Sequence, residues 1–139
     1  DKIIVLVAYN PRKSFLFSME ERCQLIREIF KGCECIQVDS HDGLLIDYLQ
    51  KSGASTILRG MRALSDFEYE FQMALMNRRQ TKNVETVFLM SGFRWFFTSS
   101  NIIKEVASLG GTVRGLVPDN VYQRLLEKYP NKKTTGGRL

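Results

Sequence analysis

Long apolar segments and paired cysteines are both missing from this sequence of 139 residues. No apolar run approaches the ~18 residues that a membrane-spanning helix needs, so we expect a soluble protein with no membrane partner. Its three cysteines are an odd number without the spacing of a disulfide framework or a zinc site. This favours a reducing compartment, most simply the cytoplasm. The single histidine, His41, leaves no dependable Ser-His-Asp or Cys-His pair for nucleophilic catalysis.

Proline is scarce as well, with three residues, and the ten glycines are an ordinary share, which together exclude a fibrous or low-complexity chain. At 44% hydrophobic and 25% charged residues, the composition suits one globular domain, which we place at residues 1–128. The formal net charge of +5 falls to +1 without the four cations of residues 128–139, so 129–139 is expected to be a solvated basic tail. A nucleic-acid binder that uses this tail is the weakest interpretation, and we expect no nucleic-acid partner.

Strand and helix patterns alternate along the chain. The continuous apolar run in 2–9 predicts a strand buried on both faces of a parallel sheet. Pairs of serine and glutamate at Ser18/Glu21 and Ser65/Glu68 predict capping boxes at the start of two helices. The sequence therefore predicts an α/β domain with one parallel sheet and right-handed crossovers. Further strands are expected near 36–38, 56–58 and 84–90, and helices near 44–50, 65–79, 99–109 and 118–128. Gly53 is the expected C-cap of the helix at 44–50.

Cations follow three of the four expected strands. Because ligands bind at the carboxyl ends of parallel strands, these cations predict a pocket for several phosphates. The alternative is that polar residues simply collect in loops. The cations concerned are Arg12, Lys13, Arg59, Arg62 and Arg94.

A polar stretch, 98–101, immediately precedes the helix expected at 99–109. Its hydroxyls and the free N–H groups of the first helical turn form an anion site. One of these residues alone could instead serve as an ordinary N-cap. Four such residues exceed what a cap requires, which favours contact with phosphate.

The helix expected at 65–79 combines an apolar stripe with acidic residues. Phe67, Phe71 and Leu75 fall on one face and predict core positions. Asp66 lies in the first turn, where a carboxylate favours the helix dipole in any case. Glu70 can accept a hydrogen bond from a ligand amino group if it faces the cleft. From the residues alone, we expect a polyphosphate- or nucleotide-binding α/β protein of unknown reaction.

The stretch 56–70, TILRGMRALSDFEYE, resembles a signature block of bacterial phosphopantetheine adenylyltransferases. This resemblance implies a Rossmann-like nucleotidyltransferase that makes dephospho-coenzyme A and pyrophosphate from ATP and 4′-phosphopantetheine, with Mg²⁺ as cofactor. It also implies a homohexamer in the cytoplasm, with coenzyme A as a feedback ligand. Other segments that carry the resemblance are 76–78, 88–90, 95–101, 104–107 and 118–121.

The resemblance also assigns site residues. Lys13 is the implied catalytic residue, and phosphopantetheine is implied to contact Lys13, Leu45 and Arg59. No protein ligand to a metal is implied. The residues implied to contact ATP are Gly60, Met61, Arg62, Glu70, Trp95, Phe96, Phe97, Thr98, Ser99, Ser100 and Asn101.

Some family features have no counterpart in these residues. The family begins with a strand, a Thr-Phe-Asp-Pro turn and a Gly-His motif whose histidine stabilises the transition state, and His41 lies in the wrong place to replace it. Because that strand is central in the sheet, we expect an N-terminal strand–helix unit to precede this sequence. Asn101 stands where a third serine is common, and Ser14 where a second lysine is common. The alternative function is a non-catalytic nucleotide or coenzyme A binding module.

Overall fold

Strands and helices alternate along the chain in the order that the sequence predicts, and this confirms the α/β class. The computed structural model describes residues 2–95 and 97–130. They belong to two compact units. The first unit holds the segments before His41 and after Phe97, and the second unit spans His41–Phe97. Phe96 and most of the expected tail, 131–139, lie outside the described residues.

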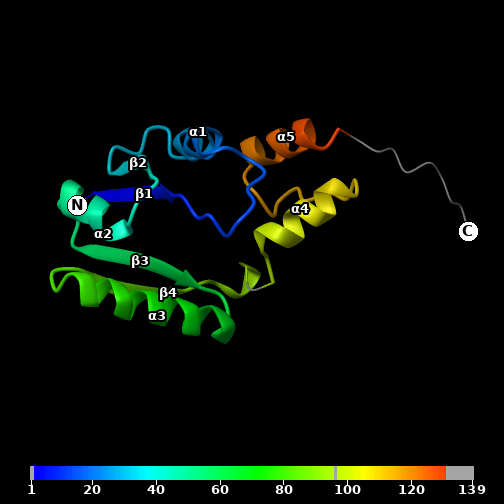
Figure 1. Ribbon diagram of the computed structural model, residues 1–139. Helices are drawn as coiled ribbons and strands as arrows, with labels where there is room; N and C mark the ends of the chain where they lie inside the picture. The colour runs from blue at the N-terminus through cyan, green and yellow to red at the C-terminus, as the bar shows by residue number, and fades with distance from the viewer. Residues whose placement is uncertain (1, 96, 131–139) are drawn as a thin grey trace, which may run out of the picture. The chain divides into compact units, whose positions relative to one another are not determined.

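The first unit begins with a short strand pair. β1 (Ile3–Ala8) pairs with β2 (Ile36–His41), and α1 (Met19–Ile29) connects them (Figure 1). The expected capping box of α1 is confirmed. The Ser18 hydroxyl accepts the backbone N–H of Glu21 at 3.1 Å, and the Glu21 carboxylate accepts the backbone N–H of Ser18 at 2.8 Å. Two N–H groups that a helix start leaves unpaired are thereby satisfied.

Two more helices complete this unit. α4 (Ser100–Ser108) and α5 (Asp119–Lys128) share a core centred on Val113, which is only 1% exposed. Ile103 from α4 and Leu125 from α5 pack against Val113. Both helices therefore bury one apolar face in this core.

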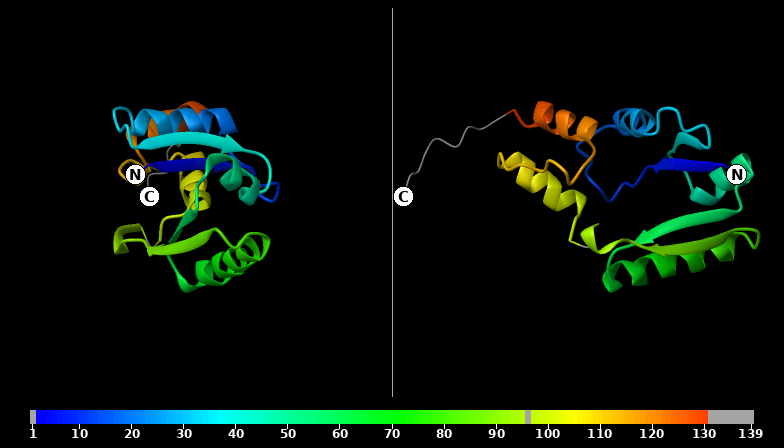
Figure 2. Two further views of the ribbon diagram at one scale, coloured as in Figure 1. Left: turned by 90° about the vertical axis from the view of Figure 1, so that its left-hand side faces the viewer. Right: turned by 180° about the vertical axis from the view of Figure 1, so that it is seen from behind.

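Helices α1 and α5 lie side by side (Figure 2), and polar contacts join them. The side-chain amide of Asn120 donates to the Leu25 carbonyl and to the Glu28 carboxylate, both at 3.0 Å. Lys128 Nζ lies 2.9 Å from the Glu21 carboxylate. Hydrogen bonds from Asn120 to Glu28 and from Lys128 to Glu21 lower the pKa of each glutamate. Both carboxylates are therefore held in their charged form.

The second unit contains the other strand pair. α2 (Leu45–Ser52) ends at Gly53, whose φ of 71° is the left-handed C-cap that the sequence predicts. β3 (Thr56–Met61) and β4 (Glu85–Met90) pair in parallel along their whole length. α3 (Leu64–Gln80) connects them and lies along one side of the pair (Figure 2). Four buried residues join α2 to this sheet: Ile46, Leu49, Ile57 and Val84.

The register of β3 and β4 decides which side chains face α3. Arg59 lies opposite Phe88, and the Phe88 ring meets the Phe67 ring of α3 edge-on at a centroid distance of 6.3 Å. Side chains alternate along a strand, so Leu58 and its partner Val87 point to the other face. There they are 53% and 42% exposed. Arg59 is thus on the side of the sheet that α3 covers.

The strand arrangement differs from the single sheet that the sequence predicts. The four strands form two sheets of two, β1–β2 and β3–β4. The expected burial of β1 on both faces is also wrong, since Ile3 is 48% exposed and Val7 alone in this strand is fully buried. The physical reason is that β1 has one neighbouring strand within 2–95 and 97–130, so its side chains keep more contact with solvent.

Two expectations for α3 are wrong as well. The helix begins at Leu64 with Ala63 as its N-cap, so position 65 lies inside the first turn and is not the N-cap that the sequence predicts. Three residues of its predicted core stripe are more than 40% exposed, because the two-stranded sheet beneath the helix covers little of it: Phe67, Phe71 and Leu75.

All three cysteines are free thiols. Cys23 is buried on α1, where its Sγ lies 3.9 Å from the Asp39 carbonyl oxygen. Cys33 and Cys35 lie between α1 and β2, and both are exposed. In the part of the chain that the structure describes, no helix is both long enough and apolar enough to cross a membrane.

Candidate functional site

Two of the expected phosphate-binding arginines lie at the carboxyl end of β3. Arg59 belongs to the strand, which runs three residues further than the sequence predicts, and Arg62 follows its last residue. The Arg59 side chain is 46% exposed and the Arg62 side chain 40% exposed. α3 supplies a carboxylate to each of them.

Glu70 of α3 binds Arg59 at two points. Arg59 Nε donates to Glu70 Oε2 at 2.6 Å, and Nη2 donates to Oε1. The Glu70 side chain is only 13% exposed, and its hydrogen bonds raise the pKa of Arg59 further above its ordinary value. Both carboxylate oxygens already accept a hydrogen bond, so a ligand amino group would have to use their remaining lone pairs.

Asp66 holds Arg62 in a different way. Its Oδ2 accepts from Arg62 Nε at 3.1 Å and from the Arg62 backbone N–H at 3.2 Å. Its Oδ1 accepts from Arg62 Nη2 at 3.4 Å. The side-chain hydrogen bond is the main cause that lowers the pKa of Asp66, followed by the backbone one. One carboxylate therefore fixes both the turn after β3 and the guanidinium that the turn carries.

The start of α4 keeps exposed polar groups beyond its cap. Ser99 is the N-cap, and its hydroxyl accepts the Ile102 backbone N–H at 3.2 Å. Ser100 and Asn101 are exposed in the first turn, and Thr98 precedes the cap. A phosphate at this helix start would meet backbone N–H groups and hydroxyls together.

The loop after β1 carries Lys13 at the surface. Asn10 shapes this loop, because its side-chain oxygen accepts the Arg12 backbone N–H at 2.9 Å and its carbonyl accepts that of Lys13 at 3.2 Å. Both cations are exposed. This turn presents Arg12 and Lys13 next to each other in the first unit.

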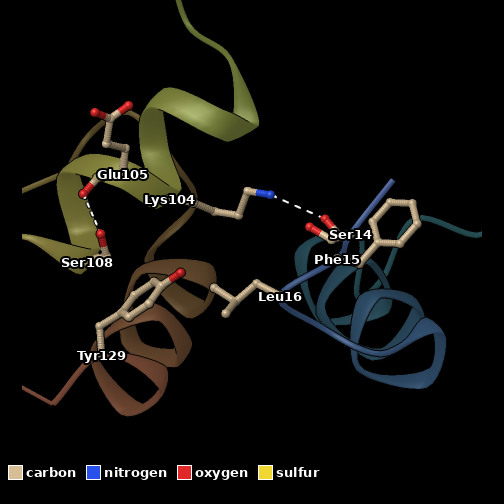
Figure 3. Close-up of a pocket in the computed structure, with 7 residues that line it drawn as sticks. All are labelled: Ser14, Phe15, Leu16, Lys104, Glu105, Ser108 and Tyr129. Atoms are coloured by element: carbon tan, nitrogen blue, oxygen red, sulfur yellow. Dashed lines mark hydrogen bonds between the residues drawn. The ribbon is translucent and has the colours of Figure 1, made fainter. Parts of the chain in front are cut away.

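A shallow hollow of about 370 Å³ lies beside this loop (Figure 3). Lys104 of α4 points across it and donates from Nζ to the Ser14 carbonyl oxygen at 3.3 Å. The contact ties α4 to the residue next to Lys13. The other residues around the hollow are Phe15, Leu16, Glu105, Ser108 and Tyr129.

Three positions implied in substrate contact offer no free polar side chain. Leu45 is partly buried against the core of the second unit. Met61 is 9% exposed, and its carbonyl oxygen accepts the Ser91 backbone N–H at 2.8 Å. Gly60 is exposed, and no atom lies within 4 Å of the place where a Cβ would stand. Contacts at these positions would come from backbone groups or apolar surface.

Aromatic residues follow β4. The short 3-10 helix η1 (Phe93–Trp95) places the Arg94 guanidinium over the Trp95 ring, 4.9 Å from its centroid. Trp95 is 39% exposed and Phe97 is 79% exposed. Such open aromatic surface suits the stacking of a base.

Reasoning from the sequence missed the role of Asp66. The acid was expected to interact with the helix dipole, because it lies in the first turn of a helix. The available signal was only the four-residue separation of Arg62 and Asp66, and because Arg62 precedes the helix, the rule for helical pairs does not by itself predict the contact.

The described side chains form no preformed binding site for a divalent cation. Within 2–95 and 97–130, no group of three or more His, Cys, Asp or Glu residues could hold a metal ion. The acids nearest the end of β3, Asp66 and Glu70, are both hydrogen-bonded to arginines. An ion at this place would have to bring most of its oxygen ligands with it.

Comparison with known proteins gives a consistent result. Residues 1–106 match the family model described as cytidylyltransferase-like. The chain is 57% identical over 130 residues to a phosphopantetheine adenylyltransferase of Syntrophus aciditrophicus strain SB, covering 94% of this chain and 79% of that protein. It is 56% identical over 129 residues to the protein of the same name in Nitratidesulfovibrio vulgaris strain DP4, covering 93% and 69%. The protein of that name in Lawsonia intracellularis is 49% identical over 134 residues, covering 96% and 78%.

Proposed function

This chain belongs to the phosphopantetheine adenylyltransferases, within the cytidylyltransferase-like nucleotidyltransferases, and on that basis we propose that it converts ATP and 4′-phosphopantetheine into dephospho-coenzyme A and pyrophosphate. The observation that carries the proposal is an identity of 57% that extends over 94% of the chain. A similarity of this extent does not rest on one motif. The Rossmann-like α/β fold follows from the same family.

The chemistry agrees with the polar groups at the ends of the strands. An oxygen of the 4′-phosphate attacks the α-phosphorus of ATP, a new P–O bond forms, and the bond to the leaving pyrophosphate breaks. Two polyanions must approach each other, so cations have to cancel their repulsion and hold them in line. Arginine suits this task, because its planar guanidinium binds phosphate oxygens at two points. No covalent enzyme intermediate is required.

The proposed division of the residues follows the family. Lys13, Leu45 and Arg59 bind phosphopantetheine, with Lys13 also stabilising charge during the transfer. ATP is bound by Gly60, Met61, Arg62, Glu70 and the segment 95–101. The geometry that supports this division is the pair of oriented arginines beside β3 and the exposed first turn of α4.

We also propose that the chain assembles as a homohexamer. α3 carries apolar side chains that remain exposed, namely Tyr69 at 53%, Met73 at 41% and Met76 at 53%. Their spacing of four and three residues places them on one face of the helix. A patch of this kind is typical of a surface covered by another chain. Light scattering after size exclusion tests the proposal, and Met73→Lys is expected to lower the mass.

Mg²⁺, a cytoplasmic location and feedback by coenzyme A complete the proposal. Since no cluster of metal ligands occurs in the described residues, we expect Mg²⁺ to be held chiefly by the phosphates of ATP. Free thiols at Cys33 and Cys35 are consistent with a reducing compartment.

The test is a turnover assay on the full-length protein. ATP and 4′-phosphopantetheine are mixed with the enzyme, pyrophosphate is measured, and dephospho-coenzyme A is identified by mass. Reactions that lack either substrate serve as controls. Binding of ATP without formation of either product would contradict the proposal and support a non-catalytic nucleotide or coenzyme A binding module.

A further inference from the structure

Arg62 is anchored at both ends by one carboxylate. Asp66 Oδ2 accepts the Arg62 backbone N–H at 3.2 Å and the Nε–H at 3.1 Å, while Oδ1 accepts from Nη2 at 3.4 Å. Asp66 lies in the first turn of α3, and Arg62 lies in the turn before the helix. The side chain of Arg62 is therefore folded against its own turn, and part of its guanidinium remains exposed.

From this geometry we propose that Asp66 is a positioning residue, which orients the Arg62 guanidinium toward the phosphates of a bound nucleotide. The inference rests on the proposed function, in which Arg62 binds ATP. An arginine has four rotatable side-chain bonds, and ordering them upon ligand binding weakens affinity. Asp66 imposes that order before the ligand arrives.

The neighbouring pair follows the same plan. Asp66 and Glu70 are four residues apart and share one face of α3. Each holds an arginine from the carboxyl end of β3, Arg62 and Arg59 respectively. Since the two arginines carry like charge, the two carboxylates also lower the cost of placing both cations at the end of one strand. A single helix face thereby sets the orientation of two guanidiniums.

The competing explanation is purely structural. An acid in the first turn favours the helix dipole, and Asp66 would then stabilise α3 without any effect on ligand binding. That explanation predicts a lower melting temperature in Asp66 variants and an unchanged dissociation constant for ATP. The positioning role predicts a change in ATP affinity that depends on Arg62.

A double-mutant cycle on the full-length protein separates the two explanations. ATP binding is measured by calorimetry for the wild type, Asp66→Asn, Arg62→Ala and the double variant. We expect Asp66→Asn to weaken ATP binding about tenfold, the effect of losing one charge-assisted hydrogen bond. In the Arg62→Ala background the same substitution should change affinity less than about twofold, because Asp66 has nothing left to orient.

Two further variants keep the test decisive. Glu85→Gln is the matched control. Glu85 begins β4, at the end of the strand pair away from Arg62, and its carboxylate lies 3.6 Å from the Arg78 guanidinium. We expect this substitution to leave ATP affinity unchanged. Asp66→Glu keeps the charge with a longer side chain, and we expect a loss of affinity smaller than that of Asp66→Asn. If Asp66→Asn does not fold, the cycle is run with Asp66→Glu instead.

Equal effects of the Asp66 substitution in both Arg62 backgrounds would overturn the inference, as would an unchanged affinity in the wild-type background. A wild type that binds ATP but makes no product would contradict the proposed function alone, because the cycle still reports on ATP binding. A wild type that binds no ATP would contradict both.

Discussion

The carboxylate of Glu70 accepts two hydrogen bonds from the guanidinium of Arg59, one from Nε at 2.6 Å and a second from Nη2. The pair joins β3 to α3 at the carboxyl end of β3, where we propose that substrate phosphates bind. A two-point contact fixes the plane of the guanidinium as well as its position. A phosphate that reaches Arg59 therefore meets a group whose orientation is already set.

Replacing Arg59 should separate the two substrates. We expect Arg59→Ala to raise the KM for phosphopantetheine about tenfold or more and to change the KM for ATP less than about threefold, because one phosphate loses a charge-assisted partner. Arg59→Lys should recover only part of the loss, since an ammonium cannot make the two-point contact. Steady-state kinetics with each substrate varied in turn measures the effect. Unchanged constants for both substrates would remove Arg59 from the site.

The two serines at the start of α4 should behave differently. Ser99→Ala removes the N-cap hydrogen bond to Ile102 and is expected to lower the free energy of unfolding by about 1 kcal/mol. Ser100→Ala leaves that cap in place, so we expect unchanged stability and weaker ATP binding. Urea denaturation and calorimetry on both variants give the comparison. The idea of a phosphate site fails if Ser100→Ala binds ATP as tightly as the wild type.

Asn120 should matter for the attachment of α5 to α1. Asn120→Ala leaves the Leu25 carbonyl without its side-chain donor, and we expect a loss of about 1–2 kcal/mol in the free energy of unfolding. The exposed Asn83, in the turn between α3 and β4, offers a matched control in Asn83→Ala, with a change below about 0.5 kcal/mol. Equal stability of the two variants would show that the contact contributes nothing.

Acid should weaken the same attachment. Asn120 and Lys128 lower the pKa of Glu28 and Glu21 in the folded chain. A carboxyl with a lowered folded pKa contributes stability above its unfolded pKa of about 4.3, and this contribution disappears as the pH falls through the folded pKa. We expect the melting temperature to decline below about pH 4.3, and to decline less steeply in the Glu21→Gln/Glu28→Gln double variant. Parallel curves for both proteins would contradict this.

Local features of the fold were predictable from the sequence, and pairing between distant segments was not. The capping box at Ser18 and the C-cap at Gly53 depend on neighbours a few residues away, so the pattern alone locates them. The division of the strands into two sheets depends on which strand lies beside which, and an apolar run such as that of β1 carries no such information. Its exposure could not be foreseen for the same reason.

The site shows the same limit. Arg59 and Arg62 could be identified as phosphate-binding candidates, because cations at strand ends are visible in the sequence. Their partners were missed. Arg59 and Glu70 are eleven residues apart on different elements, so no local spacing joins them. Arg62 and Asp66 are four residues apart, but Arg62 precedes the helix, and the usual rule for helical pairs does not apply to it.

The unequal exposure of the cysteines gives the first unit a built-in chemical probe. Cys33 and Cys35 are exposed to a thiol reagent in the native protein, whereas Cys23, on α1 itself, is buried. Alkylation should therefore proceed in two phases. Cys33 and Cys35 react rapidly, and Cys23 reacts slowly, because its thiol becomes accessible only when α1 opens locally. In the Cys33→Ser/Cys35→Ser background, the slow rate alone would report how often that helix opens while the rest of the chain stays folded.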